Sequence, residues 1–135
     1  MRRRKAREYA LQLLFQLEIT EKPFDNAVLE EFWSDKKEDR EIKEFTLDLI
    51  EGTLKHRDSL DKVIKKVAEH WSMERMAIVD RCILRFAAYE LLYREDIPPS
   101  VTINEAIEVA KKFSTTDSAS FINGILDRIA KSKRA

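Results

Sequence analysis

The chain has 135 residues, 25 basic and 25 acidic side chains, one Cys and two Gly, and 44% of its residues are apolar. One Cys cannot form a disulfide framework, and so few Gly argue against all-β folds, P-loops and dinucleotide-binding fingerprints. The sequence contains no apolar run of the roughly 20 residues that span a membrane, and the basic start lacks the small-residue cleavage site of a signal peptide. We therefore expect one soluble, cytoplasmic helical domain over residues 1–135.

The first half of the chain has helical apolar spacing in four segments, 6–17, 28–33, 42–54 and 60–71. In the segment 6–17 the apolar residues recur at i, i+3, i+4 and i+7, which is typical of a helix with one buried face, and the other three segments have apolar residues at helical spacing. Asp25 is the predicted N-cap of the second segment. A polar connector, 34–39, separates it from the third.

The most hydrophobic segment of the chain is 76–92, and we expect this helix at the centre of the fold. Ser72 is its predicted N-cap, and Pro98-Pro99 is predicted to stop it. The pair Thr102 and Glu105 has the spacing of a capping box, which predicts the start of the next helix.

The last predicted helix carries apolar residues from 121 to 129 and has Asp117 or Ser118 as its N-cap. Gly124 lies inside it, where Gly costs roughly 1 kcal/mol relative to Ala, so we expect a close helix–helix contact there. These patterns predict an all-α protein of about seven helices.

The residue types used in catalysis and metal binding are scattered along the chain. His56 and His70 lie in separate segments, and neither belongs to a pair with metal-ligand spacing. Cys82 lies in the most hydrophobic segment and is expected to be a buried thiol rather than a nucleophile. We therefore predict a protein that is not an enzyme and has no cofactor or metal.

The basic side chains concentrate at the N-terminus. Residues 1–17 carry five basic and one acidic side chains, whereas 18–51 carry twelve acidic and five basic ones, which predicts one basic and one acidic face. Four of the five N-terminal basic residues are arginines, Arg2, Arg3, Arg4 and Arg7. Because Arg binds phosphate bidentately and stacks on bases, this start indicates either nucleic-acid binding or a solvated terminus.

The segment 116–124 combines hydroxyls, a carboxylate and the aromatic Phe121. Local pattern alone favours Phe121 as a core residue behind an N-cap. An exposed Phe121 could instead stack on a base of single-stranded RNA, with Asp117 and Ser118 as hydrogen-bonding neighbours.

Several of these short patterns, taken in order, resemble the NusB family of bacterial antitermination factors. The resemblance extends over nearly the whole chain and rests on the following segments: Ala6-Arg7-Glu8-x-Ala10-x-Gln12, Ile83-Leu84-Arg85-x-Ala87-x-Tyr89-Glu90-Leu91, Ile97-Pro98, Ile103-Asn104-Glu105-Ala106, Ala110-Lys111-Lys112-Phe113 and Phe121-Ile122-Asn123-Gly124-Ile125-Leu126-Asp127.

The resemblance implies two packed three-helix bundles and a role in antitermination with RNA polymerase. The RNA would be the boxA element of ribosomal RNA leader transcripts, and the protein partner would be NusE, a small-subunit ribosomal protein. Carried onto this sequence, and with Arg2 added from the basic start, the implied RNA contacts are Arg2, Arg3, Arg4, Arg7, Gln12, Asp117, Ser118 and Phe121. The implied NusE contacts are Phe15, Asp80, Tyr89 and Glu90.

Other functions are compatible with the same patterns. NusB-like domains also occur in ribosomal RNA cytosine methyltransferases, but those chains carry a cofactor-binding α/β domain with a Gly-rich loop. A bundle that binds only proteins is a further alternative, although the four arginines argue against it. The chain could be a monomer or a homodimer.

Overall fold

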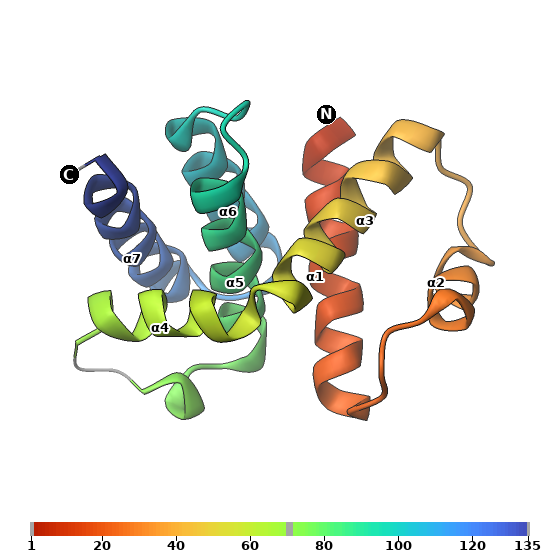
Figure 1. Cartoon of the computed structure of the whole chain (residues 1–135), viewed down its shortest axis with the longest axis horizontal. Helices are drawn as coiled ribbons and strands as arrows, with labels where there is room; N and C mark the ends of the chain where they lie inside the picture. Colours follow the sequence, from red (N-terminus) through yellow and green to blue (C-terminus); the bar gives the residue numbers. More distant parts are fainter. Residues whose placement is uncertain (1, 70–71, 135) are drawn as a thin grey trace.

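The computed structural model of the chain describes residues 2–69 and 72–134, and these residues form helices without strands. The last two residues of the predicted segment 60–71, His70 and Trp71, therefore lie outside the described residues. The elements are α1 Arg2–Thr20, α2 Asn26–Trp33, α3 Arg40–Lys55, α4 Arg57–Val67, the 3₁₀ helix η1 Met73–Arg75, α5 Ile78–Tyr93, α6 Pro99–Phe113 and α7 Thr116–Arg134 (Figure 1). The predicted all-α class is confirmed.

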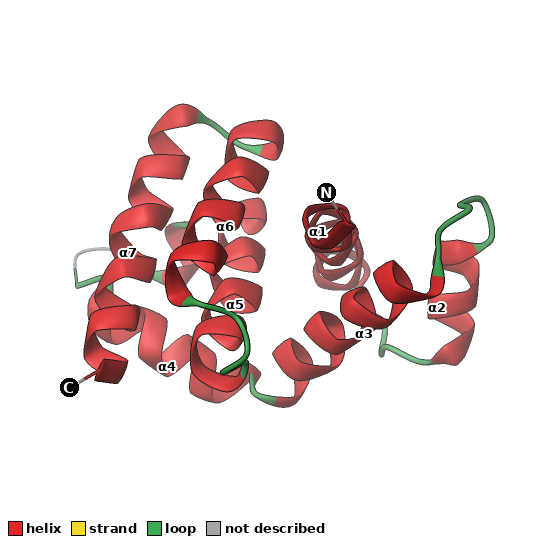
Figure 2. Cartoon of the chain, turned by 90° about the horizontal axis from the view of Figure 1, so that it is seen from above, coloured by secondary structure: helices red, strands yellow, loops and turns green. Residues whose placement is uncertain are grey.

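The helices form two groups that lie side by side. The N-terminal group is the three helices α1–α3, and the C-terminal group is the four helices α4–α7 (Figures 1 and 2). Helix α5 packs against α1 and α3 of the first group and against α4, α6 and α7 of the second. Every residue of α5 from 82 to 91 is buried, which confirms the predicted central helix.

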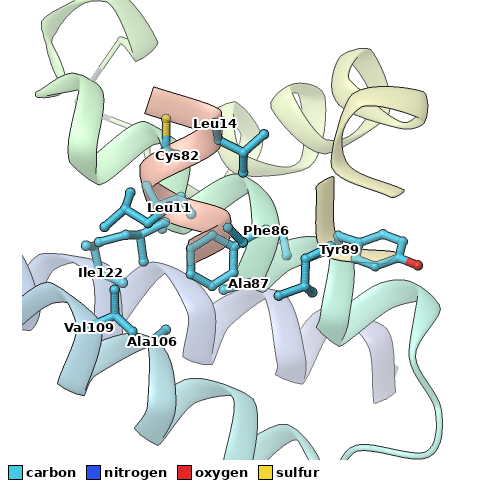
Figure 3. Close-up of a cluster of buried hydrophobic side chains, with 14 of the residues drawn as sticks. Leu11, Leu14, Cys82, Phe86, Ala87, Tyr89, Ala106, Val109 and Ile122 are labelled. Carbon is cyan, nitrogen blue, oxygen red and sulfur yellow. The ribbon is translucent and has the colours of Figure 1, made fainter. Parts of the chain in front are cut away.

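The core contains apolar side chains from both groups. Figure 3 shows Leu11 and Leu14 of α1, Phe86 and Ala87 of α5, and Ile122 of α7 in one buried cluster, with Ile122 close to Leu11. Each fully buried Leu, Ile or Phe contributes about 1.5–3 kcal/mol through burial. Cys82 is 2% exposed in this core, as expected, and its burial raises the pKa of the thiol to about 11.

Two helix starts in the first half of the chain depend on aspartates. The Asp25 carboxylate accepts a hydrogen bond from the Val28 amide at 2.9 Å, which confirms the predicted cap of α2. Asp39, which we placed in the polar connector, caps α3 by accepting from the Ile42 amide at 3.0 Å. Both caps satisfy amides that have no partner inside their helix.

The predicted cap at Ser72 and the predicted capping box are wrong. Ser72 precedes η1 and makes no side-chain capping bond, and α5 begins only at Ile78. Helix α6 begins three residues before Thr102, at Pro99, whose fixed φ suits a first helical position. Thr102 and Glu105 therefore lie inside the helix, and their side chains bond α5 and α1 instead.

The start of α7 and its glycine also differ from expectation. Thr115, not Asp117 or Ser118, supplies the local cap, because its hydroxyl accepts from the Ser118 amide at 3.0 Å. A Cβ atom placed on Gly124 would meet nothing within 4 Å, so no close helix contact explains this glycine. No described helix combines the length and the hydrophobicity needed to span a membrane.

Candidate nucleic-acid and partner interface

Two of the arginines in the first turn of α1 pair with acidic side chains from elsewhere in the chain. Arg2 forms a salt bridge with Asp39, and Glu41 lies 3.8 Å away. Arg4 donates two hydrogen bonds to Glu105 of α6, at 3.0 and 2.7 Å. This bidentate pair raises the pKa of Arg4 and lowers the pKa of Glu105.

Arg3 differs from its two neighbours because it forms no ion pair among the described side chains. Its guanidinium carbon lies 4.6 Å from the centroid of the Phe45 ring, a cation–π contact. The nearby carboxylates are held by Arg94, which bonds Asp48 at 2.7 Å and Asp96 at 2.8 and 2.9 Å. Hydrogen bonding to Arg94 lowers the pKa of Asp96 to about 2. The exposed Arg3 guanidinium is thus available to an external anion.

Arg7 and Glu90 lie in the interior and bond each other. The Arg7 guanidinium donates to both carboxylate oxygens of Glu90, at 2.8 and 2.7 Å, and Thr102 donates a third bond to Glu90 at 3.0 Å. Arg7 is 1% exposed and Glu90 is fully buried. Arg7, a predicted RNA contact, and Glu90, a predicted NusE contact, therefore join α1, α5 and α6. Neither side chain reaches the surface in this structure.

Gln12 and Phe15 do reach the surface of α1. Gln12 is exposed and borders a hollow between α1 and the end of α2. Phe15 is 37% exposed, and Ile19, one turn further along the helix, is 55% exposed. These two neighbours, Phe15 and Ile19, form an apolar pair that we call the α1 apolar patch.

Asp80 is in the first turn of α5 and bonds the connection between α6 and α7. One carboxylate oxygen accepts from the Ser114 hydroxyl at 2.8 Å, and the other accepts from the Ser118 hydroxyl at 2.7 Å. Asp80 is only 6% exposed. The side chain predicted to contact NusE is therefore occupied within the chain.

The three predicted RNA contacts of the last helix gather around one pocket. Asp117, Ser118 and Phe121 line it together with Asp80 and the segment 75–77, and its volume is about 250 Å³. Asp117 is exposed and Phe121 is half-buried, so Phe121 contributes both to packing and to the surface. The structure thus brings the three residues to one pocket, whereas the local pattern alone favoured Phe121 as a core residue.

Tyr89 lies against α3 and does not project outward. Its ring packs on Gly52, where any side chain would overlap it, and its hydroxyl donates to Asp48 at 2.9 Å. Burial and the bond to Asp48 raise its pKa to about 12. His56 is half-buried and stacks on Tyr93 with ring centroids 4.0 Å apart.

The packing of α1 beside α6 connects the two groups of predicted RNA contacts. Arg4 bonds Glu105 near the start of α6, and Glu8 accepts from Lys112 near its end at 3.0 Å. Gln12 is one further turn along α1, about 6 Å beyond Glu8, in the direction in which α6 approaches α7. The arginine-rich turn and the α7 pocket therefore lie toward opposite ends of the α1–α6 pair.

Comparison with known proteins identifies the family. The family model described as the NusB family matches residues 4–131. The transcription antitermination protein NusB of Thermodesulfovibrio yellowstonii is 54% identical over 140 residues, covering 97% of this chain and 93% of that protein. The chain belongs to the NusB family.

Solved NusB structures have the same fold. NusB from T. maritima is 43% identical, with a TM-score of 0.87, covering 96% of this chain and 90% of that one. A crystal structure of the antitermination factors NusB and NusE in complex with double-stranded RNA matches with a TM-score of 0.87 and 23% identity, covering 97% of each chain. The curated NusB of Desulfitobacterium hafniense is 50% identical over 133 residues, covering 98% of this chain and 90% of that protein.

Several residues that shape this NusB-family surface were missed from the sequence. Glu105 was assigned to a helix cap, and Asp39, Phe45 and Lys112 were given no role beside the N-terminal helix. Gly52 was a possible signal, because a glycine inside an apolar helical pattern often marks a close contact. The acidic partners of the arginines carry no local signal of this kind.

Proposed function

We propose that this chain is a non-catalytic transcription antitermination factor that binds boxA-type single-stranded RNA together with the ribosomal protein NusE. It would act as one unit in the cytoplasm, where nascent ribosomal RNA leaders are made, and would join RNA polymerase through the assembled complex. The observation that carries this proposal is near-full-length membership of the NusB family, combined with Arg3 at the start of α1, which has no ion-pair partner among the described residues.

On the RNA side, the proposal assigns different roles to the predicted residues. Arg3 would bind phosphate, since it is exposed and has no carboxylate partner among the described residues. Arg2 would exchange its exposed partner Asp39 for phosphate. Arg4, whose side chain is 35% exposed, would contact phosphate while staying bonded to the buried Glu105. Arg7 would act indirectly, by holding α1 in place through Glu90.

At the other end of the α1–α6 pair, Phe121 would stack on a base, with Asp117 accepting hydrogen bonds from base amino groups. The pocket of about 250 Å³ beside them has room for part of an unstacked base. Gln12 lies between the two ends and would contact the connecting nucleotides.

On the protein side, the α1 apolar patch is the most suitable contact for NusE. Phe15 is the one exposed member of the four predicted NusE contacts, and Ile19 extends its apolar surface. Tyr89 and Glu90 would support the interface from inside, because each is at least nine-tenths buried and hydrogen-bonded within the chain. Asp80 is equally buried but bonds Ser114 and Ser118 of the α6–α7 connection, so we assign it no part in NusE binding.

The test is a titration of the full chain with a short boxA-type RNA and with a scrambled RNA of equal length and composition. We expect tighter binding to the boxA-type RNA, and a further increase when NusE is present. Equal affinity for both RNAs, unaltered by NusE, would overturn the proposal. The variant Phe15→Ser should lose the NusE effect and keep the RNA preference, whereas Ser100→Ala, a change at an exposed site elsewhere, should alter neither.

A further inference from the structure

We propose that Asp80 is a positioning residue that holds the RNA-binding segment at the start of α7 in its binding conformation. The inference rests on the proposed function for its biological meaning, but on the hydrogen bonds of one carboxylate for its physical basis. It replaces the expectation that Asp80 contacts a protein partner.

Asp80 fixes both ends of the α6–α7 connection at once. Ser114 directly follows α6, and Ser118 lies in the first turn of α7. Their hydroxyls donate to different oxygens of the same carboxylate, at 2.8 and 2.7 Å. The short connection from Ser114 to Ser118 therefore has little freedom to move, because both of its ends are bonded to the Asp80 carboxylate on the central helix.

The position of Asp80 suits a structural anion. It lies in the first turn of α5, where the free amides and the helix dipole favour a negative charge, and Ala77 before it supplies no side-chain cap. Both carboxylate oxygens are occupied and the residue is 6% exposed, so little of the charge is presented to RNA phosphates.

We call the hydrogen bonds from Ser114 and Ser118 to Asp80 the clamp, and this clamp controls the orientation of the predicted RNA contacts. Phe121 is three residues beyond Ser118 on the same helix face, and Asp117 immediately precedes Ser118. All three line the pocket beside Asp80. Fixing Ser118 therefore fixes the ring and the exposed carboxylate before RNA arrives, which lowers the ordering entropy that binding must offset.

The experiment compares two ways of removing the clamp in the full chain, Asp80→Asn and the double variant Ser114→Ala/Ser118→Ala. Asp58→Asn is the matched control, because Asp58 is an exposed carboxylate in the first turn of α4. Hydrogen exchange of residues 114–121 reports loop order, while titrations with boxA-type RNA over a range of salt and with NusE alone report binding.

We expect faster exchange in 114–121 and roughly tenfold weaker RNA binding in both clamp variants, because the lost preorganisation must be regained on binding. The slope of log affinity against log salt should stay at the wild-type value, since no phosphate-binding cation is removed. NusE affinity and the Asp58→Asn control should be unchanged.

Unchanged exchange in both clamp variants would overturn the inference, and so would a loss of NusE affinity with intact RNA binding in Asp80→Asn. If the wild-type protein does not distinguish boxA-type from scrambled RNA, the proposed function fails. The exchange measurement still decides whether Asp80 orders the α6–α7 connection in that case.

Discussion

Four arginines in the first two turns of α1 have similar sequence environments and different partners. Arg7 bonds a buried glutamate 83 residues away, Arg4 bonds Glu105, which is 101 residues away, and Arg3 contacts only an aromatic ring among the described side chains. The sequence indicated a basic, RNA-binding start but could not divide these roles, because each depends on which distant side chain folding brings near.

Arg3→Ala should weaken RNA binding and reduce the salt slope by roughly 0.7, the value for one lost single-strand phosphate contact. Its unfolding free energy should stay within about 0.5 kcal/mol of the wild type, since the side chain is exposed. Titrations at several salt concentrations measure the slope, with Arg40→Ala as the matched control because the Arg40 side chain is 91% exposed at the start of α3. The same slope in Arg3→Ala and wild type would show that Arg3 touches no phosphate.

Arg7→Ala should destabilise the fold by about 3–5 kcal/mol, because it leaves the buried Glu90 charge without its partner. Urea denaturation measures the change, and Arg40→Ala again provides the surface comparison. A stability loss no larger than that of Arg40→Ala, together with a smaller RNA salt slope, would instead make Arg7 a direct RNA contact.

Phe121→Leu should reduce RNA affinity by about 1–3 kcal/mol, since leucine keeps apolar bulk but cannot stack on a base. The half-buried position of Phe121 makes leucine a milder change to packing than alanine. RNA titration and thermal unfolding of the same variant separate the two roles. A lower melting temperature with unchanged affinity would place Phe121 in the core alone.

At the scale of helices, local signals predicted the elements well and their ends less well. Asp25 caps α2 as expected, because no distant side chain of the described residues bonds its carboxylate. Thr102 and Glu105 have the spacing of a capping box, yet Glu90 and Arg4 take their side chains. Apolar periodicity repeats over many residues and survives such competition, whereas a cap depends on one side chain.

The two glycines should respond in opposite directions to replacement by alanine. Gly52→Ala should cost about 1–3 kcal/mol, because the new methyl group overlaps the Tyr89 ring between α3 and α5. Gly124→Ala should stabilise the protein by up to about 1 kcal/mol, since it improves helix propensity in open space. Urea denaturation tests both, and destabilisation by Gly124→Ala would reveal a contact that the structure does not contain.

For the whole molecule, the sequence correctly predicted an all-α fold with α5 at its centre, but its charge map needs revision. We expected separate basic and acidic faces, yet Asp39 and Glu41 of the acidic segment lie beside Arg2 of the basic one. Charge counted along the chain cannot show this, because α3 folds back along α1. Because Arg2 and Arg4 pair with carboxylates of the same chain, fewer basic side chains are free to bind an external anion.

The ion pairs of Glu105 with Arg4 and of Asp96 with Arg94 predict that the protein loses stability in acid. The pKa of Glu105 lies below its ordinary value of 4.5, and that of Asp96 falls from 3.8 to about 2. The unfolded chain therefore binds more protons as the pH falls through this range, and the stability contributed by the two carboxylates disappears toward pH 2. Urea denaturation from about pH 6 to about pH 2 should show this decline, with a shallower decline in Glu105→Gln. An identical pH dependence in that variant would exclude Glu105 as a contributor.

The central claim is that one protein binds boxA-type RNA and NusE jointly, and a complete binding cycle tests it most directly. Calorimetry would measure RNA binding with and without NusE, and NusE binding with and without RNA. Joint binding requires that each ligand raise the affinity for the other by the same factor, through linkage, and we expect that scrambled RNA does not raise the affinity for NusE. Independent binding of NusE and RNA, with equal affinity for the two RNAs, would contradict it.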